Sequence, residues 1–255
     1  MPAGAPVHKL IRSILVVTLV IVSVILAWQV AVVALSVPSY IVPRPATVAA
    51  AFVEDFGRIA SHSAFTLASA GLGLGLSAIL ASAIAVAFSM APALEQSSMP
   101  IVLVLRSTPV AAVAPLMTLF LGRGIGTSVA VVTVIAFFPI LVNLLRGIAA
   151  VDANIVELLQ VYGASNMQQM RLVRLQFALP YLFTGLRVSG TSALLGAMLS
   201  EWITGSPGLG KLILDAGEMR ETELLWAAVL TSVAIALTVF WSTSAVEKRL
   251  LSWKA

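Results

Sequence analysis

Residues 205–212, which read GSPGLGKL, resemble a nucleotide-binding motif in their residue types and spacing. Gly205, Gly210 and Lys211 are spaced as in a phosphate-binding loop, where glycine N–H groups and a lysine surround the phosphates of a nucleotide. The pattern fails at Leu212, because a serine or threonine is needed there to hold Mg²⁺. A strand should also precede such a loop, whereas here an apolar run does. The sequence therefore predicts no nucleotide-binding site at this segment.

The chain offers few other residues for catalysis or metal binding. His8 and His62 are its two histidines, and it has no cysteine. Two histidines so far apart in sequence indicate neither a zinc site nor a histidine-dependent hydrolase, and no HExxH pattern occurs. We therefore predict no catalytic residue, no metal site and no cofactor bound by this chain, and the composition disfavours an intramembrane hydrolase.

The overall composition is typical of a membrane protein. Hydrophobic residues make up 60% of the chain, charged residues 10%, and the mean hydropathy is +1.04. Too few polar residues remain to cover a water-exposed surface. We predict an all-α membrane protein, a single domain over residues 1–255, with six spans of about 20 apolar residues each. The predicted spans cover residues 13–35, 63–89, 100–121, 127–145, 183–204 and 224–244, so that 63–244 form the core.

The distribution of basic residues predicts the orientation of these spans. With the N-terminus inside, ten of the 15 lysines and arginines face the cytoplasm, and the outer set is Arg44, Arg58, Arg123, Lys211 and Arg220. This asymmetry favours cytoplasmic termini at both ends. Arg106 and Arg187 lie within predicted spans, near the cytoplasmic end, where long side chains can reach the interface. The net charge of +4 follows from this topology, and nothing in the sequence predicts nucleic-acid binding.

Prolines in the third and fourth spans indicate where a solute pathway would lie. Pro109, Pro115 and Pro139 interrupt apolar helices, and the carbonyl groups they free need partners inside the protein or in water. One interpretation is a pathway beside these kinks; the other is ordinary kinked helices with internally bonded polar groups. The candidate lining residues of such a pathway are Ser107, Thr108, Pro109, Asn143, Met198 and Glu201.

Glu201 is the one acidic residue at the edge of a predicted span, and Trp202 follows it. An acidic side chain at membrane depth is costly and usually faces a cavity or a partner. Glu201 is therefore a candidate for a gate at the outer mouth. The alternative is an interfacial residue beside a belt tryptophan.

A polar segment from residue 146 to 183 separates the fourth and fifth spans. Asn154 precedes Glu157 by three residues, and Ser165 precedes Gln168 by three, so that each pair has the spacing of a helix-starting capping box. Gly163 lies between the two pairs, where a left-handed conformation would end the first helix. The segment therefore predicts a helix, a turn and a second helix that stops or kinks at Pro180.

The first of these helices is amphipathic. Ile155, Leu158, Leu159 and Tyr162 recur at the spacing of one helix face, on a segment too polar to enter a membrane. An apolar face in that setting predicts contact with a partner.

This segment resembles the cytoplasmic loop of the permease subunits of bacterial binding-protein-dependent ABC importers. The family signature has a Glu-Ala-Ala triplet, a later glycine and a Leu-Pro pair. Glu157, Gly163, Leu179 and Pro180 match it, whereas Leu158 and Leu159 replace the two alanines. The stretches VPSYIVPRPATV, LRSTPVAAVAPLMTLFLGRGIG, AFFPILVN and SEWITGSPGLGKLI are similar to the nitrate, sulfonate and taurine branch, so that the resemblance covers about residues 37–250.

The resemblance implies a fold, a function and partners. The fold would be a six-helix bundle like that of type I ABC importers, in the bacterial inner membrane. The chain would form the path of a small anionic or polar solute, delivered by a periplasmic or lipid-anchored binding protein. It would pair with a second permease subunit, most simply its own copy, within membrane lipid, and with a cytoplasmic ATPase dimer that holds ATP and Mg²⁺. Residues expected to couple to that ATPase are Asn154, Ile155, Glu157, Leu158, Leu159, Tyr162, Gly163, Ala164, Ser165 and Gln168.

A secondary transporter or another channel-like multi-span protein is the alternative function. A secondary transporter would show paired ionisable groups deep in its spans and an internal repeat. The sequence has neither feature, and the polar segment 146–183 would then have no explanation.

Overall fold

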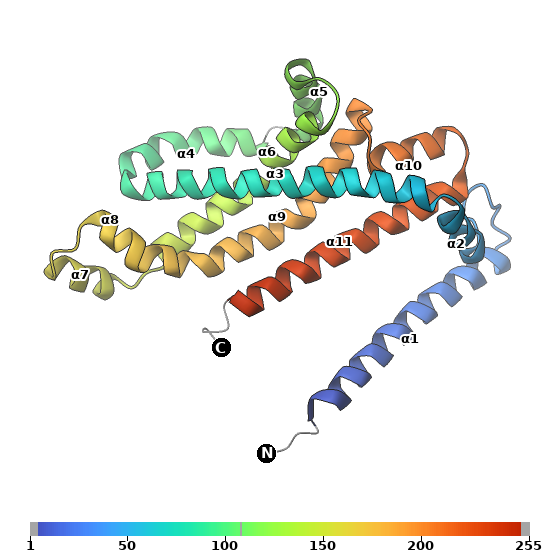
Figure 1. The fold of residues 1–255 in the computed structure, drawn as a ribbon, viewed down its shortest axis with the longest axis horizontal. Helices are drawn as coiled ribbons and strands as arrows, with labels where there is room; N and C mark the ends of the chain where they lie inside the picture. Colours follow the sequence, from blue (N-terminus) through green and yellow to red (C-terminus); the bar gives the residue numbers. More distant parts are fainter. Residues whose placement is uncertain (1–4, 108, 251–255) are drawn as a thin grey trace. The chain divides into compact units, whose positions relative to one another are not determined.

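The structure, a computed structural model, describes residues 5–107 and 109–250. All regular elements within these ranges are helical (Figure 1). The chain forms two compact units, which are described separately. The smaller unit holds the residues up to Arg58 together with Ile213–Leu230, and the larger unit holds Ile59–Leu212 together with the residues from Thr231 onward.

The helices follow one another along the chain with short connections. They are α1 (Ala5–Ala34), α2 (Pro45–Glu54), α3 (Phe56–Met90), α4 (Pro92–Ser107), α5 (Val110–Leu121), α6 (Ile125–Ala149), α7 (Ala153–Val161), α8 (Asn166–Gln169), the π-helix η1 (Met170–Arg174), α9 (Leu175–Thr204), α10 (Leu209–Glu218) and α11 (Thr222–Leu250). Five stretches are long and apolar enough to cross a membrane: Leu15–Ala34, Phe56–Met90, Ile125–Ala149, Asn166–Thr204 and Thr222–Ala245. Five of the six predicted spans coincide with these stretches.

The third predicted span, 100–121, is not a single helix. Its residues are divided between α4 and α5, which point in different directions in Figure 1. Pro109 stands at the start of α5 with an extended backbone, φ −61° and ψ 122°. Proline lacks the N–H that a continuing helix needs, and it disfavours helical geometry in the residue before it. The break therefore follows from Pro109. The mean hydropathy of residues 100–121 does not reveal this break.

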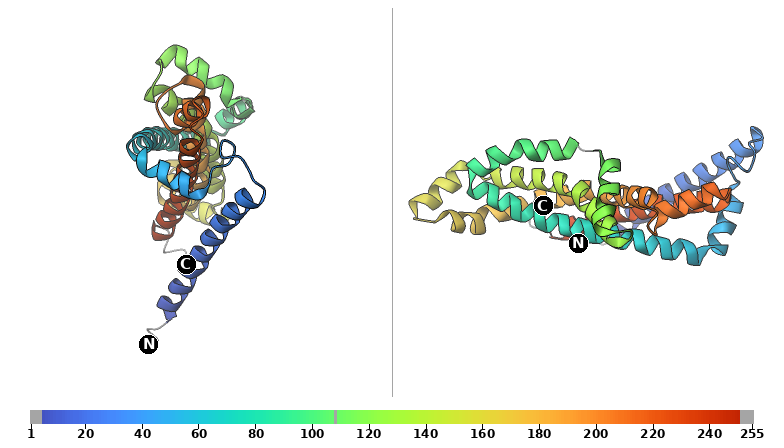
Figure 2. Two further views of the ribbon diagram at one scale, coloured as in Figure 1. Left: turned by 90° about the vertical axis from the view of Figure 1, so that its right-hand side faces the viewer. Right: turned by 90° about the horizontal axis from the view of Figure 1, so that it is seen from above.

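Helices α6 and α9 form the centre of the larger unit, where they lie side by side (Figures 1 and 2). Four small buried residues, Gly185, Ser189, Ala193 and Ala197, recur every four positions along α9. A methyl group on Gly185 would approach the Ile140 Cα atom of α6 to 3.0 Å. Ser189 Oγ donates a hydrogen bond to the Ala136 carbonyl oxygen at 3.0 Å. Small residues let two helix backbones pack closely where lipid gives no hydrophobic driving force, and this pair therefore forms a rigid frame.

Helix α3 also packs against α6 through the same kind of contact. Gly73 lies directly against Val132 and the Val129 carbonyl oxygen, too close for any side chain at position 73. Further along α3, Ala81 and Ala85 are fully buried against α6 residues such as Leu141. The larger unit thus has a core of three helices, α3, α6 and α9.

An ion pair joins α9 and α11 within the larger unit. The Arg187 guanidinium contacts the Glu247 carboxylate, and both side chains are largely buried. The sequence predicts that Arg187 reaches the interface and does not predict Glu247 as its partner. The side chain of Arg106, the other arginine within a predicted span, lies outside the described residues.

Aromatic and polar contacts hold the smaller unit together. The Trp28 ring of α1 lies against the Trp226 ring of α11, with centroids 5.4 Å apart. Trp226 Nε1 donates to the Ile41 carbonyl oxygen at 3.3 Å. Arg58 pairs with Asp55 at 3.1 Å and lies 3.6 Å from Glu221. These contacts tie the connection between α1 and α2 to the start of α11.

Candidate functional site

The polar segment between α6 and α9 begins with a cap that differs from the predicted one. Asp152 is the N-cap of α7: its Oδ1 accepts a hydrogen bond from the Asn154 backbone N–H at 2.9 Å and another from the Asn154 side-chain amide at 2.9 Å. The predicted capping box of Asn154 and Glu157 is therefore wrong. Aspartate is as good an N-cap as asparagine, and the helix begins at Ala153, before Asn154 can serve. Glu157 is exposed on the first turns of the helix.

The end of α7 agrees with the prediction. Gly163 has a φ of +73°, which is the left-handed conformation. Its N–H donates to the Gln160 carbonyl oxygen at 2.9 Å, and the Ala164 N–H donates to the Leu159 carbonyl oxygen at 2.9 Å. This pair of bonds is a Schellman motif, which satisfies carbonyl groups that the helix end leaves open. A glycine is favoured at position 163 because other residues are strained there.

The second helix starts with the predicted capping box. The Gln168 N–H donates to Ser165 Oγ at 3.3 Å, and the Ser165 N–H donates to Gln168 Oε1 at 2.7 Å. Gln169, which is buried, also donates through Nε2 to the Ala164 carbonyl oxygen at 3.0 Å. The turn between α7 and α8 is thus held from both sides by local bonds.

The chain does not leave this second helix at Pro180. Helix α8 passes through the π-helix η1 into α9, and Pro180 lies inside α9. Proline removes one backbone hydrogen bond, here the one to the Gln176 carbonyl group. The predicted stop at Pro180 is therefore wrong, and a π-helix, which was not predicted, lies at 170–174.

The apolar face of α7 is only partly the predicted one. Ile155 and Leu159 are half-buried, whereas Leu158 keeps 56% of its surface exposed and Tyr162 81%. Val161, which the predicted stripe did not include, is 84% exposed. Leu158, Val161 and Tyr162 form one exposed face of α7, which we call the α7 face. A contiguous exposed apolar face on a polar segment marks an interaction surface.

The turn at the other end of α9, residues 205–210, is held by buried polar side chains. Glu201 is fully buried; its Oε2 accepts hydrogen bonds from the Gly210 N–H at 2.9 Å and from Thr66 Oγ1 at 3.0 Å. Thr66 Oγ1 in turn accepts the Leu209 N–H at 2.9 Å. The interpretation of Glu201 as an interfacial residue does not fit this burial. Glu201 is the anchor that joins the turn to α9 and α3.

His62 and two glycines complete this arrangement, which we call the outer clasp because it lies at the end of α9 that the sequence predicts to face outward. His62 Nδ1 lies 2.8 Å from the Gly208 carbonyl oxygen and 3.1 Å from the Gly208 nitrogen. Gly208 has a φ of +142°, and a side chain there would collide with the Glu201 carboxyl group. A side chain at Gly210 would collide with the Met198 carbonyl group. The glycines are needed for close approach to α9.

The outer clasp also explains why the GSPGLGKL segment is not a phosphate-binding loop. A phosphate would need the free N–H groups of the glycine-rich turn. The N–H groups of Leu209 and Gly210 already donate to Thr66 and Glu201, and a carboxylate occupies the position where an anion would lie.

The described candidate path residues lie on three elements, at the start of α5, in α6 and in α9. Pro109 is exposed at the start of α5, the Ser107 side chain and all of Thr108 lie outside the described residues, and Met198 is half-buried beside Gly210. Asn143 Nδ2 donates to the Pro139 carbonyl oxygen at 2.7 Å, which agrees with the interpretation of an internally bonded kinked helix. Within the described ranges, no three His, Cys, Asp or Glu side chains gather as metal ligands would.

Comparisons with known proteins agree on one family. Residues 73–252 match the family described as binding-protein-dependent transport system inner membrane component. The riboflavin transport system permease protein RibX of Chloroflexus aurantiacus is 34% identical over 89% of this chain and 86% of its own length. The putative aliphatic sulfonates transport permease protein SsuC of Bacillus subtilis is 30% identical over 91% of this chain and 84% of its own. The taurine transport system permease protein TauC of Escherichia coli is 28% identical over 75% and 70%.

A solved structure has the same fold. One chain of the MetNI methionine ABC transporter, in an inward-facing conformation, superposes with a TM-score of 0.69 over 76% of this chain and 96% of its own. Its sequence is 18% identical, which supports the fold alone.

Proposed function

Because this chain belongs to the family of binding-protein-dependent transport system inner membrane components, it is a permease subunit of an ABC importer, and we propose that the α7 face transmits the action of the ATPase. The observation that supports this proposal most directly is the exposure of Leu158, Val161 and Tyr162 on a helix with two defined ends. This family membership removes the alternative of a secondary transporter. The chain is a multi-pass inner-membrane protein, and we further propose that both of its termini face the cytoplasm.

The α7 face has the character of a helix that docks into a groove. An amphipathic helix binds such a groove through apolar side chains on one face, at the spacing of Leu158, Val161 and Tyr162. The Asp152 cap and the Gly163 turn hold α7 at fixed ends, so that a movement of the helix is passed on to its neighbours. Helix α8 continues through η1 into α9, which is one of the candidate spans. A movement of α7 is therefore transmitted through a single turn to a membrane-spanning helix.

The proposed cycle is a shift between two populations of the permease. The chain pairs with a second permease subunit, most simply its own copy, and two ATPase subunits bind ATP and Mg²⁺ at their interface. Closure of the ATPase dimer favours one arrangement of the α7 helices, and ATP hydrolysis favours the other. The permease subunit binds no cofactor of its own and carries out no covalent chemistry.

The proposed solute is small and anionic or polar, and a binding protein delivers it from outside. Relatives whose names refer to sulfonates, taurine and riboflavin support this range. Ser107, Thr108, Pro109, Asn143 and Met198 remain the proposed lining of the path. Glu201 is better placed to hold the outer clasp, beside the mouth, than to touch the solute, because its carboxyl group is fully buried.

Charge substitutions on α7 test the proposal. Leu158→Asp and Tyr162→Asp place a charge in the α7 face, and each should weaken binding of the cognate ATPase at least about tenfold, as expected for a central contact of an interface. The measurement is co-purification of the ATPase from membranes with equal permease levels, together with solute-stimulated ATP hydrolysis. Gln160→Asp is the matched control, because Gln160 is also exposed on α7 but lies about half a turn away from this face. Full ATPase recovery with both charged variants would refute the assignment.

A further inference from the structure

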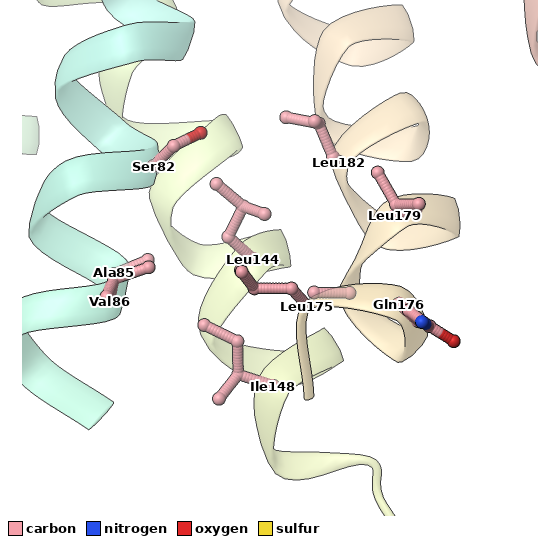
Figure 3. Close-up of a pocket in the computed structure, with 10 residues that line it drawn as sticks. Ser82, Ala85, Val86, Leu144, Ile148, Leu175, Gln176, Leu179 and Leu182 are labelled. Atoms are coloured by element: carbon pink, nitrogen blue, oxygen red, sulfur yellow. The ribbon is translucent and has the colours of Figure 1, made fainter. Parts of the chain in front are cut away.

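A cavity of about 240 Å³ lies in the larger unit, between α3, α6 and α9 (Figure 3). Aliphatic side chains surround it, and the Gln176 side chain points away from the others in Figure 3. The lining residues on which the inference depends are Ser82, Ala85, Leu144, Ile148, Leu175 and Leu179. The cavity is larger than the roughly 150 Å³ apolar cavities that stay dry and accept small hydrocarbons in other proteins. An alkyl group therefore fits the lining of this cavity better than water does.

The cavity opens toward a region in which such alkyl groups are abundant. Leu175 and Leu179 keep 38% and 42% of their surfaces exposed, so that the cavity opens along α9. The three helices that enclose it are all candidate membrane spans. The surroundings of such an opening are lipid acyl chains.

Two basic side chains lie one turn beyond the cavity, toward the loop. Arg171 precedes Leu175 by four residues across the π-helix η1, and Arg174 precedes the lining residue Ala178 by four, so that each lies about one helical turn before a lining residue. Neither arginine has an ion-pair partner among the described residues. Guanidinium groups bind phosphate strongly, and basic residues at the end of a span attract anionic lipid.

From this combination we infer that the structure holds a site for an anionic phospholipid, with one acyl chain in the cavity and the phosphate at Arg171 and Arg174. The inference does not rest on the proposed coupling function, because it requires only that the helices span a membrane. A lipid bound here would brace the junction where η1 joins α9. The site thus lies on the same connection that leads from α7 into the membrane.

Lipid binding to the purified full-length chain tests the charge part of the site. The protein is stripped of lipid in detergent and titrated with phosphatidylglycerol or phosphatidylcholine of identical acyl chains, and bound lipid is counted by native mass spectrometry. Phosphatidylglycerol should bind more tightly. Arg171→Gln combined with Arg174→Gln should lower its affinity by about 30-fold, from about 1 kcal/mol for each arginine. Arg146→Gln is the matched control, because Arg146 is exposed at the same end but lies about half a turn from the lining residues Leu144 and Ile148.

A second substitution tests the cavity itself. Ser82→Leu fills it from α3 and should reduce the binding of both lipids while it raises the thermal unfolding midpoint. Ala83→Leu is its control, because Ala83 is the exposed neighbour and does not line the cavity. Equal affinity for the two lipids, or unchanged binding with Ser82→Leu, would overturn the inference. Lipid binding that vanishes on dimerisation of the chain would also overturn it, since a second copy would then cover the opening.

Discussion

At the scale of single residues, the burial of Glu201 gives this acidic side chain a different role from the one that its sequence position suggests. A carboxyl group beside Trp202 at the end of a span suggests a wet position at the membrane surface. The structure instead places it out of contact with solvent, where it accepts hydrogen bonds from Gly210 and from Thr66, 135 positions earlier in the chain. No local pattern in the sequence predicts a partner at that separation. Gly208 and Gly210 are the signal that was available, since each allows a close approach that any side chain would prevent.

Substitution of Glu201 separates its hydrogen bonds from its charge. Glu201→Ala leaves the Gly210 N–H without its acceptor, whereas the Thr66 hydroxyl can still donate to the His62 carbonyl oxygen at 3.2 Å. A buried unsatisfied donor costs about 1–3 kcal/mol. We expect a lower thermal unfolding midpoint in detergent and impaired uptake in vesicles. Glu201→Gln keeps an acceptor oxygen for Gly210 and should lose much less on both measures. If the two variants are equally impaired, the charge itself is required and the anchoring role assigned to Glu201 is wrong.

At the scale of elements, the turn between α7 and α8 was predictable and the start of α7 was not. Gly163 and the pair Ser165 and Gln168 act within a few residues, and the bonds they form in the structure are those that their types and spacing predict. Asp152 and Asn154 are both good N-cap residues two positions apart, and sequence alone does not rank them. The exposure of Val161 depends on how α7 lies against the rest of the larger unit, which is a tertiary property.

Substitution of Gly163 tests the joint between the two helices. A side chain at this position meets no atom within 4 Å, so that the effect of a substitution comes from its backbone conformation alone. Gly163→Val places a β-branched residue in a left-handed conformation and should cost about 1–2 kcal/mol or more. We expect normal membrane levels with reduced ATPase co-purification and uptake. Gly163→Asn is the control, because asparagine tolerates this conformation; comparable losses for both variants would exclude the backbone explanation.

At the scale of the whole molecule, composition predicted a membrane-embedded helical protein and most of its spans. The exception is residues 100–121, where an apolar average conceals the break at Pro109. The close packing of α6 with α9 was also not predicted, although the four-residue recurrence of Gly185, Ser189, Ala193 and Ala197 is visible in the sequence. Small residues at that spacing occur on many helices, and the sequence does not indicate which helix packs against them.

Site-directed labelling tests the central claim, that the α7 face binds the ATPase on the cytoplasmic side. The chain has no cysteine, so that single-cysteine variants need no other change. Tyr162→Cys replaces a side chain that is 81% exposed, and Met219→Cys replaces one that is 67% exposed at the predicted outer side. A membrane-impermeant maleimide added to intact cells should label Met219→Cys alone. In opened membranes Tyr162→Cys should become labelled, and bound ATPase should protect it. Labelling of Tyr162→Cys in intact cells, or no protection by the ATPase, would contradict this account.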